Sequence, residues 1–225
     1  MKKLNPIIIL SLLLLIVGCS TDIESLQKRN NIYYKVNSDK PFSGSILSKY
    51  ESGQKKIKGY LKDGVRVGQF TEWYENGQKM GEGNLKDGKL DGLIISWWEN
   101  GQKKSEGTFK DGIEGDGLFT EWFENGQKEY EVIFKDGEPD GLLTEWFENG
   151  KKSVEGYVNM SEKKDEWNYW SPSGSKTTMV YKNGKEWDGE ESRWYGNGIR
   201  KSKNVYMSGV EIIRQSWNEK GNRIY

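Results

Sequence analysis

The chain has 225 residues, and its 34 Lys and Arg residues balance 34 Asp and Glu residues, so the formal net charge is zero. The sequence contains no His and one Cys, which excludes imidazole catalysis, His metal ligands, a disulfide framework and multi-cysteine metal sites. Balanced charge also removes the electrostatic basis for nucleic-acid binding. Because Ala is absent while Gly and Trp are abundant, the composition favours strands joined by turns over helices.

The N-terminus has the features of a lipoprotein signal peptide, which we place at residues 1–18. Lys2 and Lys3 precede an apolar run at residues 7–17, which is too short to cross a hydrocarbon core of about 30 Å as a helix but has the size of a signal-peptide core. The run ends at Gly18-Cys19 in a pattern that resembles the bacterial lipobox, in which the cysteine is lipidated and becomes the mature N-terminus. We therefore expect Cys19 to carry acyl chains such as palmitate and to hold the protein on a membrane of the bacterial cell envelope. Ser20 resembles the outer-membrane sorting pattern of two-membrane bacteria.

Residues 19–40 are then expected to form the lipidated cysteine and a polar tether. Residues 20–40 are polar and carry no clean hydrophobic periodicity, apart from a stretch at 23–29 that suits one short helix. Pro41 ends this segment.

From residue 41 to residue 225 the chain repeats itself about every 24 residues. The string Trp-aromatic-Glu-Asn-Gly occurs at residues 73–77, 97–101, 122–126 and 146–150, and weaker copies end at Gly53, Gly174, Gly198 and Gly221. A second motif, Lys-Asp-Gly, occurs at residues 62–64, 86–88, 110–112 and 135–137. Seven full copies and a terminal half account for residues 41–225, which predicts a repeat array.

Each copy has the pattern of a β-hairpin. Asn-Gly is a preferred centre of a two-residue type I′ turn, in which both residues have positive φ. We expect such turns at Asn76-Gly77, Asn100-Gly101, Asn125-Gly126 and Asn149-Gly150. Lys-Asp-Gly then supplies the turn to the next hairpin. The sequence therefore predicts an all-β, elongated array of antiparallel hairpins, each of about 24 residues.

The hairpin register follows from the turn position. If Asn76-Gly77 is the turn, the numbers of cross-strand partners sum to 153, which places Gly68 opposite Leu85. The same rule puts a glycine opposite a large apolar residue in six of seven hairpins, with Glu166 opposite Tyr181 as the exception. A slip of one residue would send every side chain to the other face, so this regularity supports the register.

Strand alternation separates two faces. Face A carries the glycines, their apolar partners, and an inner row that includes Phe70, Ile94, Phe119 and Leu143; we assign it to the core or inner curve. Face B carries a tryptophan column flanked by Thr, Glu and Lys. Its members either pack on neighbouring Lys and Thr stems or form a binding surface, and the candidate binding residues are Trp73, Trp97, Trp122, Trp146 and Trp194.

The repeat resembles the bacterial variant of the MORN repeat. The shared pattern is Gly-x4-Trp-aromatic-Glu-Asn-Gly, followed by a second Gly and by Lys-Asp-Gly, and residues 68–88 fit it throughout. The resemblance covers roughly residues 41–225 and is strongest at 68–156. It implies an elongated array of antiparallel hairpins. Bacterial members are often labelled antitoxins of toxin–antitoxin systems, and eukaryotic MORN repeats are linked to membrane or scaffold roles.

No pattern in the sequence supports catalysis, a cofactor or a metal. A glycosidase needs one unique carboxylate pair, whereas the glutamates next to tryptophan recur beside each turn, at Glu75, Glu99, Glu124 and Glu148. The acidic residues at 111–116 lack the spacing of a calcium loop. Choline-binding repeats are shorter than these and order their glycines and aromatics differently.

These observations predict a membrane-anchored lipoprotein that acts as a non-enzymatic protein-interaction module through its repeated Trp surface. One alternative is an antitoxin or immunity-type protein that neutralises a toxin in the envelope. The second is an envelope protein that binds lipid or glycan. A protein partner, which could be a toxin, and a membrane are the expected contacts, and nucleic acid is not.

Overall fold

The structure, a computed structural model, describes residues 20–182 and 184–225. The signal peptide predicted at 1–18 and the lipidation predicted at Cys19 lie outside these residues. The elements are η1 (Ile23–Ser25), β1 (Gln27–Arg29), β2 (Ile32–Tyr34), β3 (Gly44–Lys49), β4 (Lys55–Lys62), β5 (Val65–Trp73), β6 (Lys79–Lys86), β7 (Lys89–Leu90), β8 (Gly92–Trp97), β9 (Lys103–Lys110), β10 (Ile113–Glu114), β11 (Gly117–Trp122), β12 (Lys128–Lys135), β13 (Glu138–Trp146), β14 (Lys152–Asn159), β15 (Glu162–Trp170), β16 (Lys176–Lys182), β17 (Lys185–Trp194), β18 (Arg200–Met207) and β19 (Val210–Ser216).

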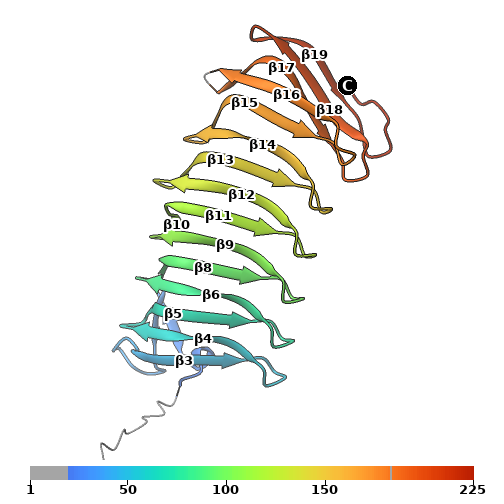
Figure 1. Cartoon of the computed structure of the whole chain (residues 1–225). Helices are drawn as coiled ribbons and strands as arrows, with labels where there is room; N and C mark the ends of the chain where they lie inside the picture. The colour runs from blue at the N-terminus through green and yellow to red at the C-terminus, as the bar shows by residue number, and fades with distance from the viewer. Residues whose placement is uncertain (1–19, 183) are drawn as a thin grey trace, which may run out of the picture.

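The strands from β3 to β19 form one long antiparallel meander, with β3 and β19 at opposite ends of the stack (Figure 1). The short strands β7 and β10 continue the turns before β8 and β11 and pair with β6 and β9. This arrangement confirms the predicted all-β array of hairpins. Within the described residues, no helix has the length and apolar character needed to cross a membrane.

The type I′ turns lie at the Lys-Asp-Gly motifs and not at the Asn-Gly pairs, where they were predicted. Asp63 and Gly64, at the centre of a Lys-Asp-Gly turn, have φ of +49° and +77°, and Lys62 pairs with Val65, which is a two-residue type I′ turn. At the Trp-aromatic-Glu-Asn-Gly motif only Gly77 has positive φ (+85°), so the type I′ prediction for Asn76-Gly77 is wrong. The same holds for the other three Asn-Gly pairs.

The Asn-Gly turn is instead a four-residue turn followed by a bulge. The Gly77 N–H donates to the Tyr74 carbonyl at 3.0 Å, and the Tyr74 N–H donates to the Gln78 carbonyl at 2.9 Å. The register shifts next to Trp73, which pairs with Lys79. Residues 75–77 therefore form a three-residue hairpin loop, in which Gly77 takes the left-handed position.

The predicted hairpin register is correct away from the turns. Gly68 lies opposite Leu85 and Gly141 opposite Val158, as the sum rule requires. The exception is corrected: Tyr181 lies opposite Asp165 and not Glu166. Asp165 has φ of +54° and takes the backbone conformation that glycine has at the same place in other hairpins, such as +72° at Gly68. Aspartate is one of the residues that tolerate this left-handed region.

Face A forms the core. One cluster of buried side chains lies on β12 to β16 and comprises Val132, Val154, Val158, Trp167, Tyr169, Met179 and Tyr181. Its largest member, Trp167, lies over Gly156 so closely that a Cβ at Gly156 would come within 2.2 Å of the indole. The second glycine of the repeat is therefore needed here to make room for a side chain of the next strand.

The segment expected to be a polar tether packs on the first hairpin. Thr21 exchanges two backbone hydrogen bonds with β3, to Ser45 and Leu47, at 2.9 and 3.0 Å. Phe42 is buried with Ile46 and Leu61, and Ile23, Leu26 and Tyr33 pack against this cluster. The predicted short helix is limited to the three residues of η1. The segment thus covers the N-terminal end of the array, as a capping repeat does.

Candidate interaction surfaces

Neighbouring hairpins are joined by the side chains of the turn motif. The Asn76 amide accepts a hydrogen bond from the Gln78 N–H at 2.9 Å and donates to the Glu99 carbonyl of the next turn at 2.8 Å. Asn100, Asn125 and Asn197 make the same pair of contacts. Three of the four predicted turn asparagines, Asn76, Asn100 and Asn125, therefore join neighbouring repeats along one edge of the array.

Where the residue after the tryptophan is Tyr or Trp, its side chain also joins neighbouring hairpins. The Tyr74 hydroxyl donates to the Trp97 carbonyl at 2.8 Å, and the Trp98 indole N–H donates to the Trp122 carbonyl at 2.8 Å. Each of these contacts bonds a hairpin to the backbone of the next one. The motif therefore has a structural role in holding the repeats together.

The face B tryptophans form a ladder with lysines. All five are half-buried, and the ammonium of Lys79 lies 5.4 Å from the ring centre of Trp97. Lys55, Lys103, Lys128 and Arg200 cover Trp73, Trp122, Trp146 and Trp194 at 5.1–5.7 Å. Each such contact contributes about 0.5–1 kcal/mol at an exposed site. The interpretation that these rings pack on neighbouring lysine stems therefore describes the structure.

Glutamates neutralise the lysines of this ladder. Lys79 pairs with Glu82 at 2.6 Å and Lys103 with Glu106 at 2.5 Å. Lys128 pairs with Glu131, and Lys152 pairs with Glu155. Basic and acidic groups thus alternate beside the tryptophans, which suits contact with a mixed protein surface better than with a highly charged polymer.

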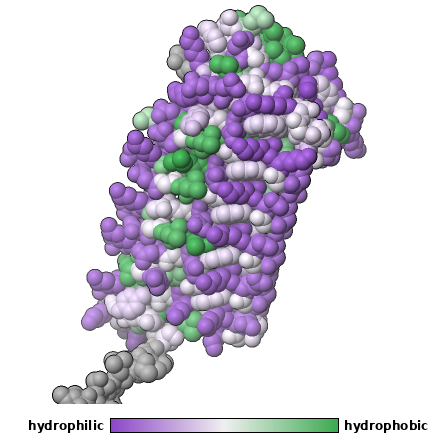
Figure 2. All heavy atoms as spheres, in the orientation of Figure 1, coloured by the Kyte–Doolittle hydropathy of each residue, from purple (hydrophilic) through white to green (hydrophobic). Residues whose placement is uncertain are grey.

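An exposed apolar stripe runs beside the ladder on face B, and sequence reasoning missed it. It consists of Leu93, Leu118, Ile133, Leu142 and Tyr157, which are 53, 53, 43, 38 and 57 % exposed. Leu118 lies opposite Ile133, and Leu142 lies opposite Tyr157. Figure 2 shows hydrophobic patches that follow one another along the array, beside rows in which pale and purple residues alternate. The recurrence of leucine about every 24 residues, at Leu93, Leu118 and Leu142, could have revealed this stripe in the sequence.

Face A holds a half-buried cation, Lys163, inside an aromatic cage. The Lys163 ammonium donates to the hydroxyls of Tyr169 and Tyr181 at 2.8 and 2.9 Å and lies 4.6 Å from the ring centre of Trp167. The Glu191 carboxylate is 3.6 Å away. Burial lowers the pKa of Lys163 and raises the pKa of both tyrosines. Such a cage is the geometry that receives ammonium ligands, but here a lysine of the chain itself fills it.

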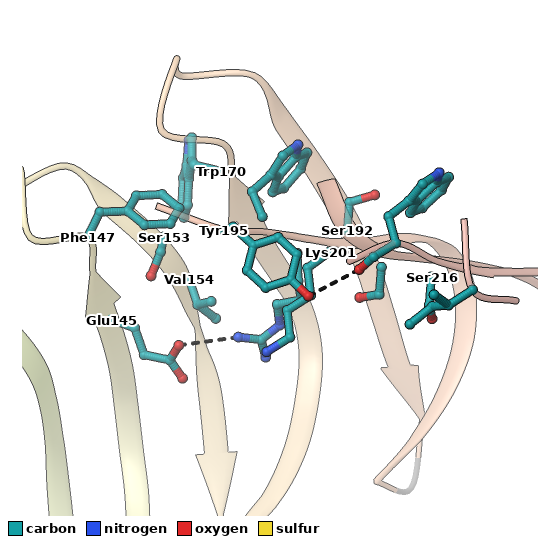
Figure 3. Close-up of a pocket in the computed structure, with 14 residues that line it drawn as sticks. Glu145, Phe147, Ser153, Val154, Trp170, Ser192, Tyr195, Lys201 and Ser216 are labelled. Atoms are coloured by element: carbon teal, nitrogen blue, oxygen red, sulfur yellow. Dashed lines mark hydrogen bonds and ion pairs between the residues drawn. The ribbon is translucent and has the colours of Figure 1, made fainter. Parts of the chain in front are cut away.

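The sheet curls beside this cage and forms a half-open pocket of about 510 Å³. The Arg193 guanidinium of β17 reaches the Glu145 carboxylate of β13 at 3.2 Å, although 48 residues separate them in sequence. Figure 3 shows this ion pair below the ring of Tyr195, whose hydroxyl donates to the Trp217 carbonyl at 3.1 Å. Phe147, Trp170 and Tyr195 supply aromatic rings to the wall.

The predicted site residues therefore separate into groups. The structure places the tryptophan column together on face B and the Asn-Gly residues together along one edge, while Cys19 lies outside the described residues. Among residues 20–182 and 184–225, no three acidic or thiol side chains are arranged to hold a metal ion.

Comparison with known families identifies part of the array. The model of the MORN repeat variant matches residues 66–87, 90–111 and 115–136, which run from β5 to the turn after β12. No curated protein matches the chain. MORN repeats commonly mediate protein or membrane interactions, and an all-β repeat array of this type is typically a binding module. The chain is therefore an array of β-hairpins that contains three MORN-variant repeats.

Proposed function

We propose that this protein is a lipid-anchored, non-enzymatic module that binds a protein partner through face B. The observation that carries the proposal is the apolar stripe, whose five side chains are 38–57 % exposed on consecutive hairpins. A contiguous exposed apolar surface with a polar border marks interaction sites in soluble domains. The Trp–Lys ladder lies alongside, so aromatic and charged groups border the stripe as they do in protein interfaces.

The shape of the array favours a protein partner over a small ligand for this face. The stripe crosses β8, β11, β12, β13 and β14, so it is long and narrow. Interfaces between proteins draw most of their binding energy from aromatic and apolar anchors that are excluded from water. Trp97, Trp122 and Trp146 lie in the same hairpins as the stripe, and contact with a partner would cover their remaining exposed edges.

A pull-down from intact bacterial envelopes tests this proposal. We expect the tagged full chain to recover one protein in near-equal amount, and the triple variant Trp97→Ala, Trp122→Ala, Trp146→Ala to recover at least tenfold less while its β-rich circular dichroism is retained. Trp187→Ala is the control, because this tryptophan is 38 % exposed and lies outside the column. Unchanged recovery by the triple variant contradicts the proposal. A toxin as the single partner would identify the neutralising function.

The anchor is the second part of the proposal, and the sequence at residues 7–19 supports it. Thr21 already bonds to β3, so only Ser20 separates the array from the lipidated residue in sequence. The array would therefore lie next to the bilayer. We expect Cys19→Ser to abolish acyl labelling and to release the protein from the membrane fraction, because several acyl chains are needed for stable anchoring. Unchanged acyl labelling in this variant contradicts the anchor.

A further inference from the structure

The pocket between β13 and β17 lies at the C-terminal end of the tryptophan column, where Trp194 lines it, and it includes none of the apolar stripe or of Trp97, Trp122 and Trp146. It is a half-open cleft that forms where the sheet curls until Glu145 and Arg193 meet, so residues from three hairpins and the C-terminal segment line one space. Its volume of about 510 Å³ lies within the range of about 300–1,000 Å³ found for small-molecule sites.

The wall combines flat aromatic rings with hydroxyl groups. Phe147, Trp170 and Tyr195 are half-buried and contribute rings, as Figure 3 shows. Ser153, Ser202 and Ser216 are also half-buried, and no hydrogen bond to a described residue uses their hydroxyls. Each of these hydroxyls can both donate and accept a hydrogen bond.

The Arg193 guanidinium at the base of the pocket is already paired, and the ammonium of Lys201, which also lines the pocket, lies 5.6 Å from the ring centre of Tyr195. Arg193 is held by Glu145 at 3.2 Å and by Glu191 at 3.5 Å, and its guanidinium lies 4.9 Å from the ring centre of Tyr169. A ligand that placed a charge beside Arg193 would have to displace one member of this set and would leave a partly buried charge without its partner. A neutral ligand carries no such penalty.

We propose that this pocket binds a neutral sugar unit of a glycan. The apolar C–H face of a pyranose ring is complementary to the negative face of an aromatic ring, and its hydroxyls match the serine hydroxyls in both donor and acceptor capacity. An aliphatic ligand would leave the three hydroxyls unpaired, and an anion would compete with Glu145. This site is independent of the protein interface proposed for face B.

Titration of the full chain in detergent with maltose, cellobiose and N,N′-diacetylchitobiose tests the site, with tryptophan fluorescence and calorimetry as readouts. We expect saturable binding of at least one of the three disaccharides. Phe147→Ala should weaken it at least tenfold, whereas Phe123→Ala, at the equivalent place one hairpin earlier, should change it less than twofold, because Phe123 does not line this pocket.

Ser202→Ala is the second variant, because it removes one hydroxyl without adding bulk to the pocket; it should weaken binding about fivefold even if Phe147→Ala fails to fold. Absence of saturable binding for all three disaccharides overturns the site, and so does an equal loss in the Phe147 and Phe123 variants. The pull-down on face B does not depend on either result.

Discussion

Replacing Trp167 with alanine is expected to lower the free energy of unfolding of the C-terminal hairpins by about 3–5 kcal/mol, the usual cost of deleting a large buried aromatic side chain. Trp167 is 2 % exposed and packs edge-to-face on Tyr181 with ring centres 6.1 Å apart. Its indole N–H donates to the Tyr157 carbonyl at 3.1 Å, and Lys163 lies over its ring. The variant therefore loses a packed ring, a hydrogen bond and one wall of the lysine cage.

Urea unfolding followed by circular dichroism measures this loss. Because a repeat array is held by contacts between nearest neighbours, we expect the C-terminal hairpins to unfold at lower urea than the N-terminal ones in the variant. Trp187→Ala is the matched control and should cost less than about 1 kcal/mol, since that ring is 38 % exposed. Equal losses for the two variants would show that face A is not the principal core.

The triple variant Leu118→Asp, Ile133→Asp, Leu142→Asp is expected to weaken binding of the recovered partner at least 100-fold, which corresponds to about 2.7 kcal/mol. Each substitution replaces apolar surface that the interface would bury with a carboxylate that has no partner there. The three side chains are 38–53 % exposed in the free chain, so the fold should change little.

Affinity by surface plasmon resonance, with circular dichroism beside it, checks this expectation. Val210→Asp provides the control, because Val210 is an apolar residue of β19 that is 62 % exposed and lies outside the stripe. A partner that binds the triple variant and the control equally well would place the interface elsewhere.

The repeat and its register were predictable because they depend on local patterns. The spacing of the motifs sets the hairpins, and the pairing of Gly68 with Leu85 follows from the turn position. The turn types were assigned to the wrong motif because Asn-Gly and Asp-Gly both favour type I′ turns, and the sequence alone does not say which loop has the extra residue. The sequence alone also did not reveal that Asp165, with its left-handed backbone, stands where the other hairpins have a glycine.

The curl of the sheet was not predictable, because it depends on small rotations that accumulate over many strands. The contact between Glu145 and Arg193 spans two repeats, and neither residue belongs to the turn motifs. The Lys163 cage depends on the same curvature, since Glu191 reaches it from β17. The apolar stripe, in contrast, repeats regularly and was hidden only by the stronger tryptophan signal.

The claim that face B receives a protein partner is tested most directly by photo-crosslinking in intact envelopes. A photoreactive residue at Leu118 or Leu142 probes face B, and one at Glu121, three residues from Leu118, probes face A of the same strand. We expect an adduct with the same single protein from Leu118 and Leu142 and none from Glu121. Adducts from Glu121 alone, or only lipid adducts from Leu118 and Leu142, would contradict it.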